Sequence, residues 1–179
     1  SHNELKKYLY NYFKQPIHSS KEPIKDNVVI IILESFNREY MGLGNGYAGY
    51  TPFLDSLAKA GKFFAYHHAN GQRSIDAVPS ILYSLPLLNE NSIINSPYEK
   101  NHFIGLPHVF GSLGYETYFF HGGHEGTMGF KRFTTHNGIK HYVGLEQYPY
   151  RDKDFDGTWG IWDEPFLSFF AKTLTESKK

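Results

Sequence analysis

Asn27-Val28-Val29-Ile30-Ile31-Ile32-Leu33-Glu34 is the stretch that decides the fold. It holds six consecutive aliphatic residues, five of them β-branched, between an amide and a carboxylate. A run without polar alternation is typical of a strand that is buried on both faces, as strands of parallel sheets are. The sequence therefore predicts a buried strand at 28–33 that ends at Glu34.

Strand and helix patterns alternate along the rest of the chain. Further strands are expected at 62–67, 115–120 and around 141–143, and helices at 4–13, 51–61, 74–85, 107–113, 127–135 and 163–174. Pro79 suggests that the helix at 74–85 starts late or is kinked. This order predicts an α/β fold, with a mostly parallel sheet that helices flank on both faces. Residues 1–26 are expected to form an N-terminal helix and linker, and residues 27–179 the α/β domain.

Composition excludes several function classes. The 179 residues carry 18 basic and 18 acidic side chains, so the formal net charge is zero and nucleic-acid binding lacks its usual electrostatic footprint. No cysteine occurs, which excludes disulfides, thiolate nucleophiles and zinc–thiolate sites. The longest apolar run is far shorter than the roughly 20 residues that span a bilayer, so we expect this chain itself to be soluble.

Polar groups follow three of the predicted strands, and ligands of parallel sheets bind at the carboxyl ends of strands. Glu34 follows the first strand, the turn Arg73-Ser74 follows the second, and His121 and His124 follow the third. Each group also has an ordinary structural interpretation, as a helix cap, a solvated arginine or a pair of packed histidines. Their convergence at one edge favours chemistry over these separate interpretations.

Four motifs together resemble the lipoteichoic acid synthase branch of the sulfatase-like enzymes, in the alkaline phosphatase superfamily. They are Val-Val-Ile-Ile-Ile-Leu-Glu-Ser-Phe at 28–36, Thr-Pro-Phe-Leu-Asp-Ser-Leu at 51–57, Asn-Gly-Gln-Arg-Ser-Ile-Asp-Ala at 70–77 and Phe-His-Gly-Gly at 120–123. The match runs in order from about residue 27 to 170. It implies an alkaline phosphatase-like fold and a hydrolase or transferase of phosphate or sulfate esters.

The resemblance also implies roles for individual residues. Glu34 would be a ligand of a divalent metal ion, with Mn, Mg, Ca and Zn all open. Ser74 would be the nucleophile, at a position usually held by threonine in the synthases, and would also touch the metal. His121 would belong to the substrate pocket, with Arg73 and His124 as weaker substrate-binding candidates. A covalent ester on Ser74 would then be resolved by water or by an acceptor alcohol.

The chain departs from the family pattern at three places. The Cys/Ser-x-Pro-x-Arg motif of formylglycine sulfatases fails after Ser74, so phosphoester chemistry fits better. The family's basic and tryptophan positions after the His-Gly turn are not clearly met, and Met128 and Phe130 lie in that region. No Asp-His pair occurs, and the family's transmembrane segments are missing. We therefore expect the N-terminal portion of an extracytoplasmic catalytic domain from a membrane-anchored parent, with little activity as an isolated chain.

Two other function classes remain open at this stage. A non-catalytic module could bind a glycan or another polar ligand through the tyrosine-rich stretch from Tyr142 to Tyr150. A fragment with an unpaired strand at the edge of its sheet could instead bind another protein chain. The enzyme hypothesis implies a phosphate or sulfate ester as the partner, linked to lipid or glycan, and no nucleic acid.

Overall fold

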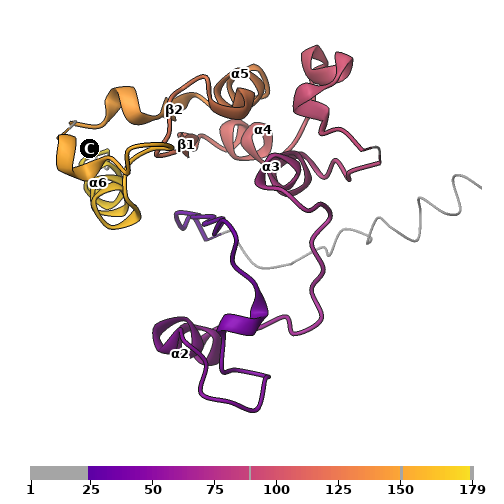
Figure 1. Ribbon diagram of the computed structural model, residues 1–179. Coiled ribbons are helices and arrows are strands. Elements are labelled where there is room, and N and C mark those ends of the chain that lie inside the picture. The colour runs from indigo at the N-terminus through magenta and orange to yellow at the C-terminus, as the bar shows by residue number, and fades with distance from the viewer. Residues whose placement is uncertain (1–23, 89, 150, 178–179) are drawn as a thin grey trace, which may run out of the picture. The chain divides into compact units, whose positions relative to one another are not determined.

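The computed structural model describes residues 24–88, 90–149 and 151–177. Its elements are drawn in Figure 1. The chain divides into two compact units, one up to Leu33 and the other from Glu34 onward. The helix predicted at 4–13 and most of the linker that follows lie outside the described residues.

The prediction of strands at 28–33 and 62–67 is wrong, because neither segment is a strand in the structure. Residues 28–33 form no regular structure, and their side chains are between 40% (Ile32) and 62% (Ile31) exposed. Residues 62–67 pass through a turn, with Phe64 and Tyr66 exposed. A strand forms only where its backbone groups pair with a neighbouring strand, and aliphatic composition favours that pairing without supplying the neighbour.

The described residues contain one two-stranded sheet, which is parallel. It pairs β1 (Tyr118–Phe120) with β2 (His141–Val143), and the register places Phe119 opposite Tyr142. The chain passes between the strands through the short 3-10 helix η4 (Thr127–Gly129) and through α5 (Phe130–His136). This strand–helix–strand unit confirms the predicted α/β class and the parallel pairing.

The predicted helices within the described residues are confirmed to within a few residues. Besides α5 they are α2 (Pro52–Ala60), α3 (Ser74–Tyr83), α4 (Leu106–Ser112) and α6 (Asp163–Glu176). Five more 3-10 turns join them: η1 (Arg38–Tyr40), η2 (Ile93–Asn95), η3 (Pro97–Lys100), η5 (Leu145–Gln147) and η6 (Asp152–Asp154). Among the described residues, no helix combines the length and the apolar character that crossing a membrane requires.

Helix α3 does not start late, because a serine from another segment takes over the hydrogen bond that its proline cannot make. Pro79 lies inside the helix and has no N–H to donate to the carbonyl of Ile75, one turn earlier. The buried Ser92 Oγ donates to that carbonyl oxygen over 3.0 Å. The helix therefore begins at Ser74, five residues before the proline.

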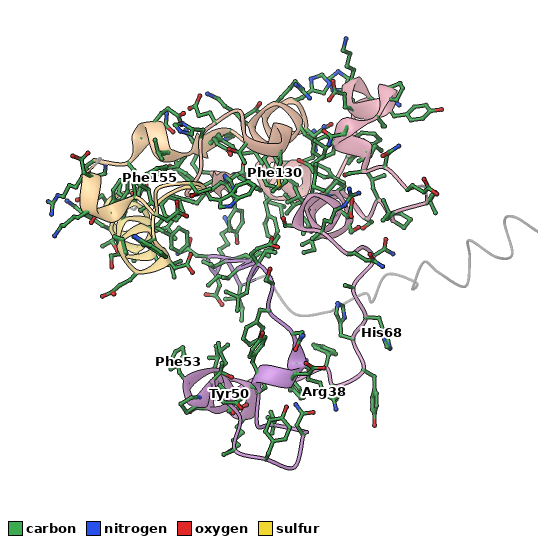
Figure 2. All side chains as sticks on the ribbon, viewed as in Figure 1. Arg38, Tyr50, Phe53, His68, Phe130 and Phe155 are labelled. Atoms are coloured by element: carbon green, nitrogen blue, oxygen red, sulfur yellow. The ribbon has the colours of Figure 1, made fainter. Side chains whose placement is uncertain are left out.

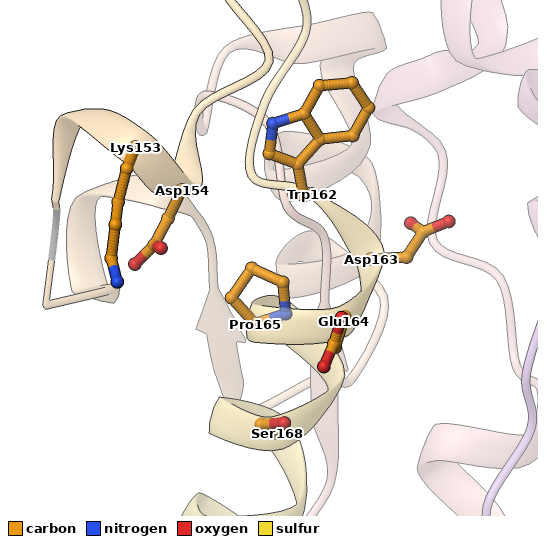
Figure 3. A pocket seen from close by; sticks show the side chains of 7 residues that line it. All are labelled: Lys153, Asp154, Trp162, Asp163, Glu164, Pro165 and Ser168. Carbon is orange, nitrogen blue, oxygen red and sulfur yellow. The ribbon is translucent and has the colours of Figure 1, made fainter.

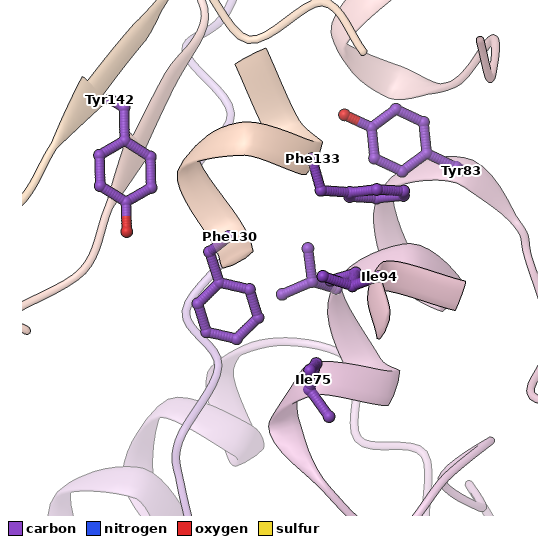
Figure 4. Packing of buried hydrophobic residues seen from close by; sticks show 7 residues of the cluster. Ile75, Tyr83, Ile94, Phe130, Phe133 and Tyr142 are labelled. Carbon is purple, nitrogen blue, oxygen red and sulfur yellow. The ribbon is translucent and has the colours of Figure 1, made fainter. Parts of the chain in front are cut away.

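The apolar core of the second unit lies where α3, α5 and η2 meet β2 (Figure 4). Phe133 is 1% exposed, and its ring meets the edge of Tyr83 at 5.4 Å. Tyr83 Oη donates to the carbonyl of the buried Asn137. Burial raises the pKa of the Tyr83 phenol. The cluster consists of Ile75, Val78, Tyr83, Ile94, Phe130, Phe133 and Tyr142.

The part of the second unit that precedes α3 is held by hydrogen bonds to a buried carboxylate rather than by an apolar core. The buried Asp55 of α2 accepts hydrogen bonds from the N–H groups of Gly42 and Leu43, each over 3.0 Å. By contrast, the apolar side chains of Tyr50 and Phe53 are 80% and 75% exposed (Figure 2). The stability of the second unit therefore depends mainly on the α3–α5 cluster.

We expect Phe133→Ala to lower the free energy of unfolding by about 3–5 kcal/mol, because it empties a fully buried aromatic site. Phe53→Ala is the matched control and should change it by less than about 0.5 kcal/mol, since that ring is already exposed. Urea unfolding followed by circular dichroism measures both. Equal effects of the two substitutions would contradict this position for the core.

Candidate functional site

Ser74 is the first residue of α3, and the chain before it is fixed by a buried carboxylate. Asp76 is 3% exposed and accepts hydrogen bonds from Arg73 Nε at 3.1 Å and Arg73 Nη2 at 3.3 Å. A Cβ at Gly71 would collide with the Cβ of Asp76, so the turn needs glycine there. These contacts orient the start of α3, where the N–H groups and the helix dipole favour negative charge.

Arg73 is largely occupied by this internal pairing. Besides Asp76 it reaches the carbonyl oxygen of Glu90 at 3.3 Å, and its side chain remains 55% exposed. Its predicted role as a substrate ligand stays a prediction, because the described contacts give it a structural role as well.

The Ser74 hydroxyl lies beside the turn that leads into α5. Ser74 Oγ is 4.0 Å from Met128 Sδ in η4. Two residues further on, Phe130 lies 5.3 Å from the His121 ring, with the two rings edge to face. The segment 128–130 thus contacts both Ser74 and His121, which brings two of the predicted site residues to the same short stretch of chain.

His121 directly follows β1, and its imidazole is partly buried. The backbone N–H of His121 donates to the carbonyl of Val143, which continues the parallel pairing beyond the strand. Within the described residues, His121 Nδ1 is buried without a hydrogen-bond partner. Burial lowers the pKa of the His121 imidazole, because the charged form loses its hydration. A neutral imidazole carries one donor and one acceptor nitrogen, and with Nδ1 buried only Nε2 could meet a ligand.

The glycines after His121 serve close packing of the chain itself. A Cβ on Gly123 would lie 3.1 Å from the carbonyl oxygen of Trp159, and the N–H of Ile161 donates to the Gly122 carbonyl. Glycine permits another group to approach the backbone closely. In the structure the segment at 159–161 occupies that space.

His124 joins a polar network at the carboxyl ends of both strands. Glu146 Oε1 lies 3.1 Å from His124 Nδ1, and both Glu146 oxygens accept from the backbone N–H of Glu125. Glu125 in turn pairs with Lys131 and accepts from Gln147 Nε2, and these hydrogen bonds lower the pKa of the Glu125 carboxyl. The network ties the loop after β1 to the turn after β2.

The sequence analysis did not single out Glu146, although a signal was present. Glu146 follows β2, so the strand-end rule that singled out His121 also points to it, whereas Tyr142 lies inside β2. Tyr142 is 8% exposed, and within the described residues its hydroxyl has no partner. Tyr148 is 9% exposed, so these two rings do not form a surface for sugar stacking, and Tyr150 lies outside the described residues.

Glu34 is exposed, and its carboxylate Oε1 accepts a hydrogen bond over 3.4 Å from Oγ of the neighbouring Ser35. No three of the described histidine, aspartate or glutamate side chains are grouped in a way that could hold a metal ion. The structure thus brings Ser74 and His121 to one segment, but it does not assemble the predicted metal site around Glu34 and Ser74.

One hollow of the second unit lies elsewhere. It measures about 630 Å³ and lies between η6 and the first turns of α6 (Figure 3). Its lining is mostly charged: Lys153, Asp154, Trp162, Asp163, Glu164, Pro165 and Ser168. None of the predicted site residues belongs to it.

The comparisons with known proteins decide the family. The sulfatase family profile matches residues 26–179, which is most of the chain. The chain belongs to the sulfatase family. Enzymes of this family hydrolyse or transfer sulfate or phosphate esters, and members of the wider superfamily generally use divalent metal ions.

Two solved structures share the fold of this sulfatase-family chain. One is the lipoteichoic acid synthase LtaP from Listeria monocytogenes, with 21% identity, a TM-score of 0.70, and coverage of 80% of this chain and 35% of LtaP. The other is a protein of the alkaline phosphatase superfamily from Vibrio parahaemolyticus, with 24% identity, a TM-score of 0.62, and coverage of 68% and 29%. The alkaline phosphatase-like fold is thereby confirmed, and the chain spans about a third of each neighbour's length.

We expect the stability of this sulfatase-family chain to depend on pH through His121. Because its pKa is lower in the folded than in the unfolded state, its contribution is complete above the unfolded value of about 6.5. Below that pH the unfolded chain binds the proton first, so stability falls by at most about 1.4 kcal/mol per pH unit. The wild type should therefore lose more stability than His121→Gln between pH 7 and 5, in urea unfolding series.

His68→Gln removes an exposed imidazole and serves as the matched control. Its stability profile should run parallel to that of the wild type. A direct check is the NMR titration of the His121 ring, and a midpoint above 6.5 would contradict the lowered pKa.

Proposed function

We propose that this protein is a metal-dependent hydrolase or transferase of phosphate or sulfate esters in which Ser74 is the nucleophile. The observation that carries the proposal is the position of Ser74 as the first residue of α3, next to the segment that also contacts His121. Family membership supports the ester chemistry, and the geometry supports the choice of serine.

The start of α3 favours the reactive form of Ser74. The N–H groups and dipole of a helix N-terminus stabilise negative charge, which favours both the alkoxide of Ser74 and the oxygens of a bound ester. Asp76 and Gly71 hold this turn through the contacts described above, so the hydroxyl is positioned before substrate binds. His121, with its lowered pKa, would contact the substrate as a neutral ring.

The reaction proceeds in two displacements. Ser74 Oγ forms a bond to the phosphorus or sulfur atom while the bond from that atom to the leaving alcohol breaks, and the alcohol ends with the proton that Ser74 loses. Water or an acceptor alcohol then attacks the serine ester and restores the hydroxyl. Ser74 does not lie in a formylglycine motif, which favours phosphate over sulfate esters.

The proposal includes a divalent metal ion because members of the wider superfamily generally use one. Glu34 and Ser74 are its proposed ligands, and the ion would supply positive charge that lowers the effective pKa of the hydroxyl. Among the described residues, no group of three histidine, aspartate or glutamate side chains could hold this ion. Substrates linked to lipid or glycan, and an extracytoplasmic, membrane-anchored parent, remain part of the same proposal.

The serine assignment predicts that Ser74→Ala lowers the turnover of an aryl phosphate by the full-length protein at least about 1,000-fold, because no other group replaces the nucleophile. Ser74→Thr should keep measurable turnover, since it retains the hydroxyl. Ser56→Ala, on the exposed side of α2, is the matched control and should behave as wild type. Full activity of Ser74→Ala would rule out the assignment.

For the metal, we expect EDTA to abolish turnover and added Mn²⁺ or Mg²⁺ to restore it. Glu34→Gln removes one proposed charged ligand, so the metal concentration at half-maximal activity should rise about tenfold or more. Glu39→Gln, a nearby exposed carboxylate, is the control. If Glu34→Gln needs no more metal than wild type, Glu34 is not a ligand.

A further inference from the structure

A thioether contacts the proposed nucleophile from outside α3. Met128 Sδ lies 4.0 Å from Ser74 Oγ, and Met128 is 39% exposed. Since this residue is accessible and touches Ser74, any substrate group held beside the hydroxyl on that side must meet it. The inference below rests on the proposed function of Ser74.

The backbone fixes Met128 in an unusual conformation. Its φ of 53° and ψ of 9° lie in the left-handed region, which side chains other than glycine rarely adopt. The next residue, Gly129, also has a positive φ of 71°, and a Cβ there would lie 3.2 Å from Ile94 Cγ2 of the core. The turn is therefore seated on the core, and packing holds Met128 where it is.

The cations around this turn are already paired with carboxylates. Lys131 pairs with Glu125, and Arg132 with Glu99. On the other side of Ser74, Arg73 pairs with the buried Asp76 at 3.1 Å. A second anionic group on the substrate would thus meet a thioether and cationic side chains that are already paired with carboxylates. An apolar group at the same place would instead gain contact with the polarizable sulfur of Met128.

We propose that Met128 is a specificity-determining residue, which contacts the organic group of the ester beside Ser74 and selects an uncharged, apolar group over one with a second negative charge. The transferred phosphate or sulfate itself remains at the start of α3. Arg73, Lys131 and Arg132 keep their internal roles and do not recognise a second anion.

The test compares two aryl esters that differ in one charge. Phenyl phosphate and 4-carboxyphenyl phosphate are given to the full-length protein, and kcat/KM is measured for each. The wild type should prefer phenyl phosphate about tenfold or more, the discrimination that one apolar contact provides. Met128→Lys should reduce or invert this ratio, and Met128→Leu should preserve it.

Met128→Gly separates specificity from folding. Glycine adopts the left-handed conformation without strain, so the thermal midpoint should stay equal or rise. The preference for phenyl phosphate should nevertheless fall, because the contact is gone. Ile104→Lys adds the same charge at a side chain that is 82% exposed and should leave the ratio unchanged.

The proposal is overturned if the wild type uses both esters equally well, or if Met128→Lys leaves the ratio unchanged. These results differ from a failure of the proposed function, in which Ser74→Ala retains turnover. An inactive Ser74→Ala variant together with an unchanged ratio in Met128→Lys would reject the specificity role alone.

Discussion

The arrangement of the candidate site depends on the packing of one ring, Phe130. It is 3% exposed, belongs to the same buried cluster as Ile75 of α3, and contacts Phe119 of β1 at 5.8 Å and His121 at 5.3 Å. Phe130 therefore joins the start of α3, the end of β1 and the turn that carries Met128.

A second constraint is electrostatic and acts where the two strands end. Both oxygens of Glu146 accept from the single backbone N–H of Glu125, Glu146 Oε1 also lies 3.1 Å from His124 Nδ1, and Glu125 is paired in turn with Lys131. The hydrogen bonds from Lys131 and Gln147 lower the pKa of the Glu125 carboxyl. The loops that present His121 and His124 are held by charge pairing as much as by apolar packing.

The sequence predicted the local elements well where punctuation residues mark their ends. Thr51-Pro52 and Gly61 bracket α2, and the strand at 141–143 was placed correctly. The sequence left the start of α3 open because Pro79 cannot donate to the Ile75 carbonyl. The donor that replaces it is Ser92, and a local sequence pattern cannot show that Ser92 lies there. The prediction of a strand at 28–33 is wrong for a related reason. The aliphatic composition of the segment indicates a preference for burial, but it does not show whether a neighbouring strand is there to pair with it. At the site, the sequence motifs pointed to Ser74 and His121. The contact between Ser74 and Met128 joins residues far apart in the sequence, so no motif could predict it.

The hydrogen bond from Ser92 to Ile75 also bears on the order in which the chain acquires structure. In an ordinary helix, carbonyl groups accept from N–H groups of the same helix. The Ile75 carbonyl of α3 instead accepts from Ser92, which is 17 residues further along the chain. Until the segment at 92–95 docks, the Ile75 carbonyl has no donor within the helix and is hydrogen-bonded to water. The proposed nucleophile therefore reaches its final geometry only as part of a cooperative unit with η2, which couples the formation of the reactive centre to tertiary folding rather than to helix formation alone.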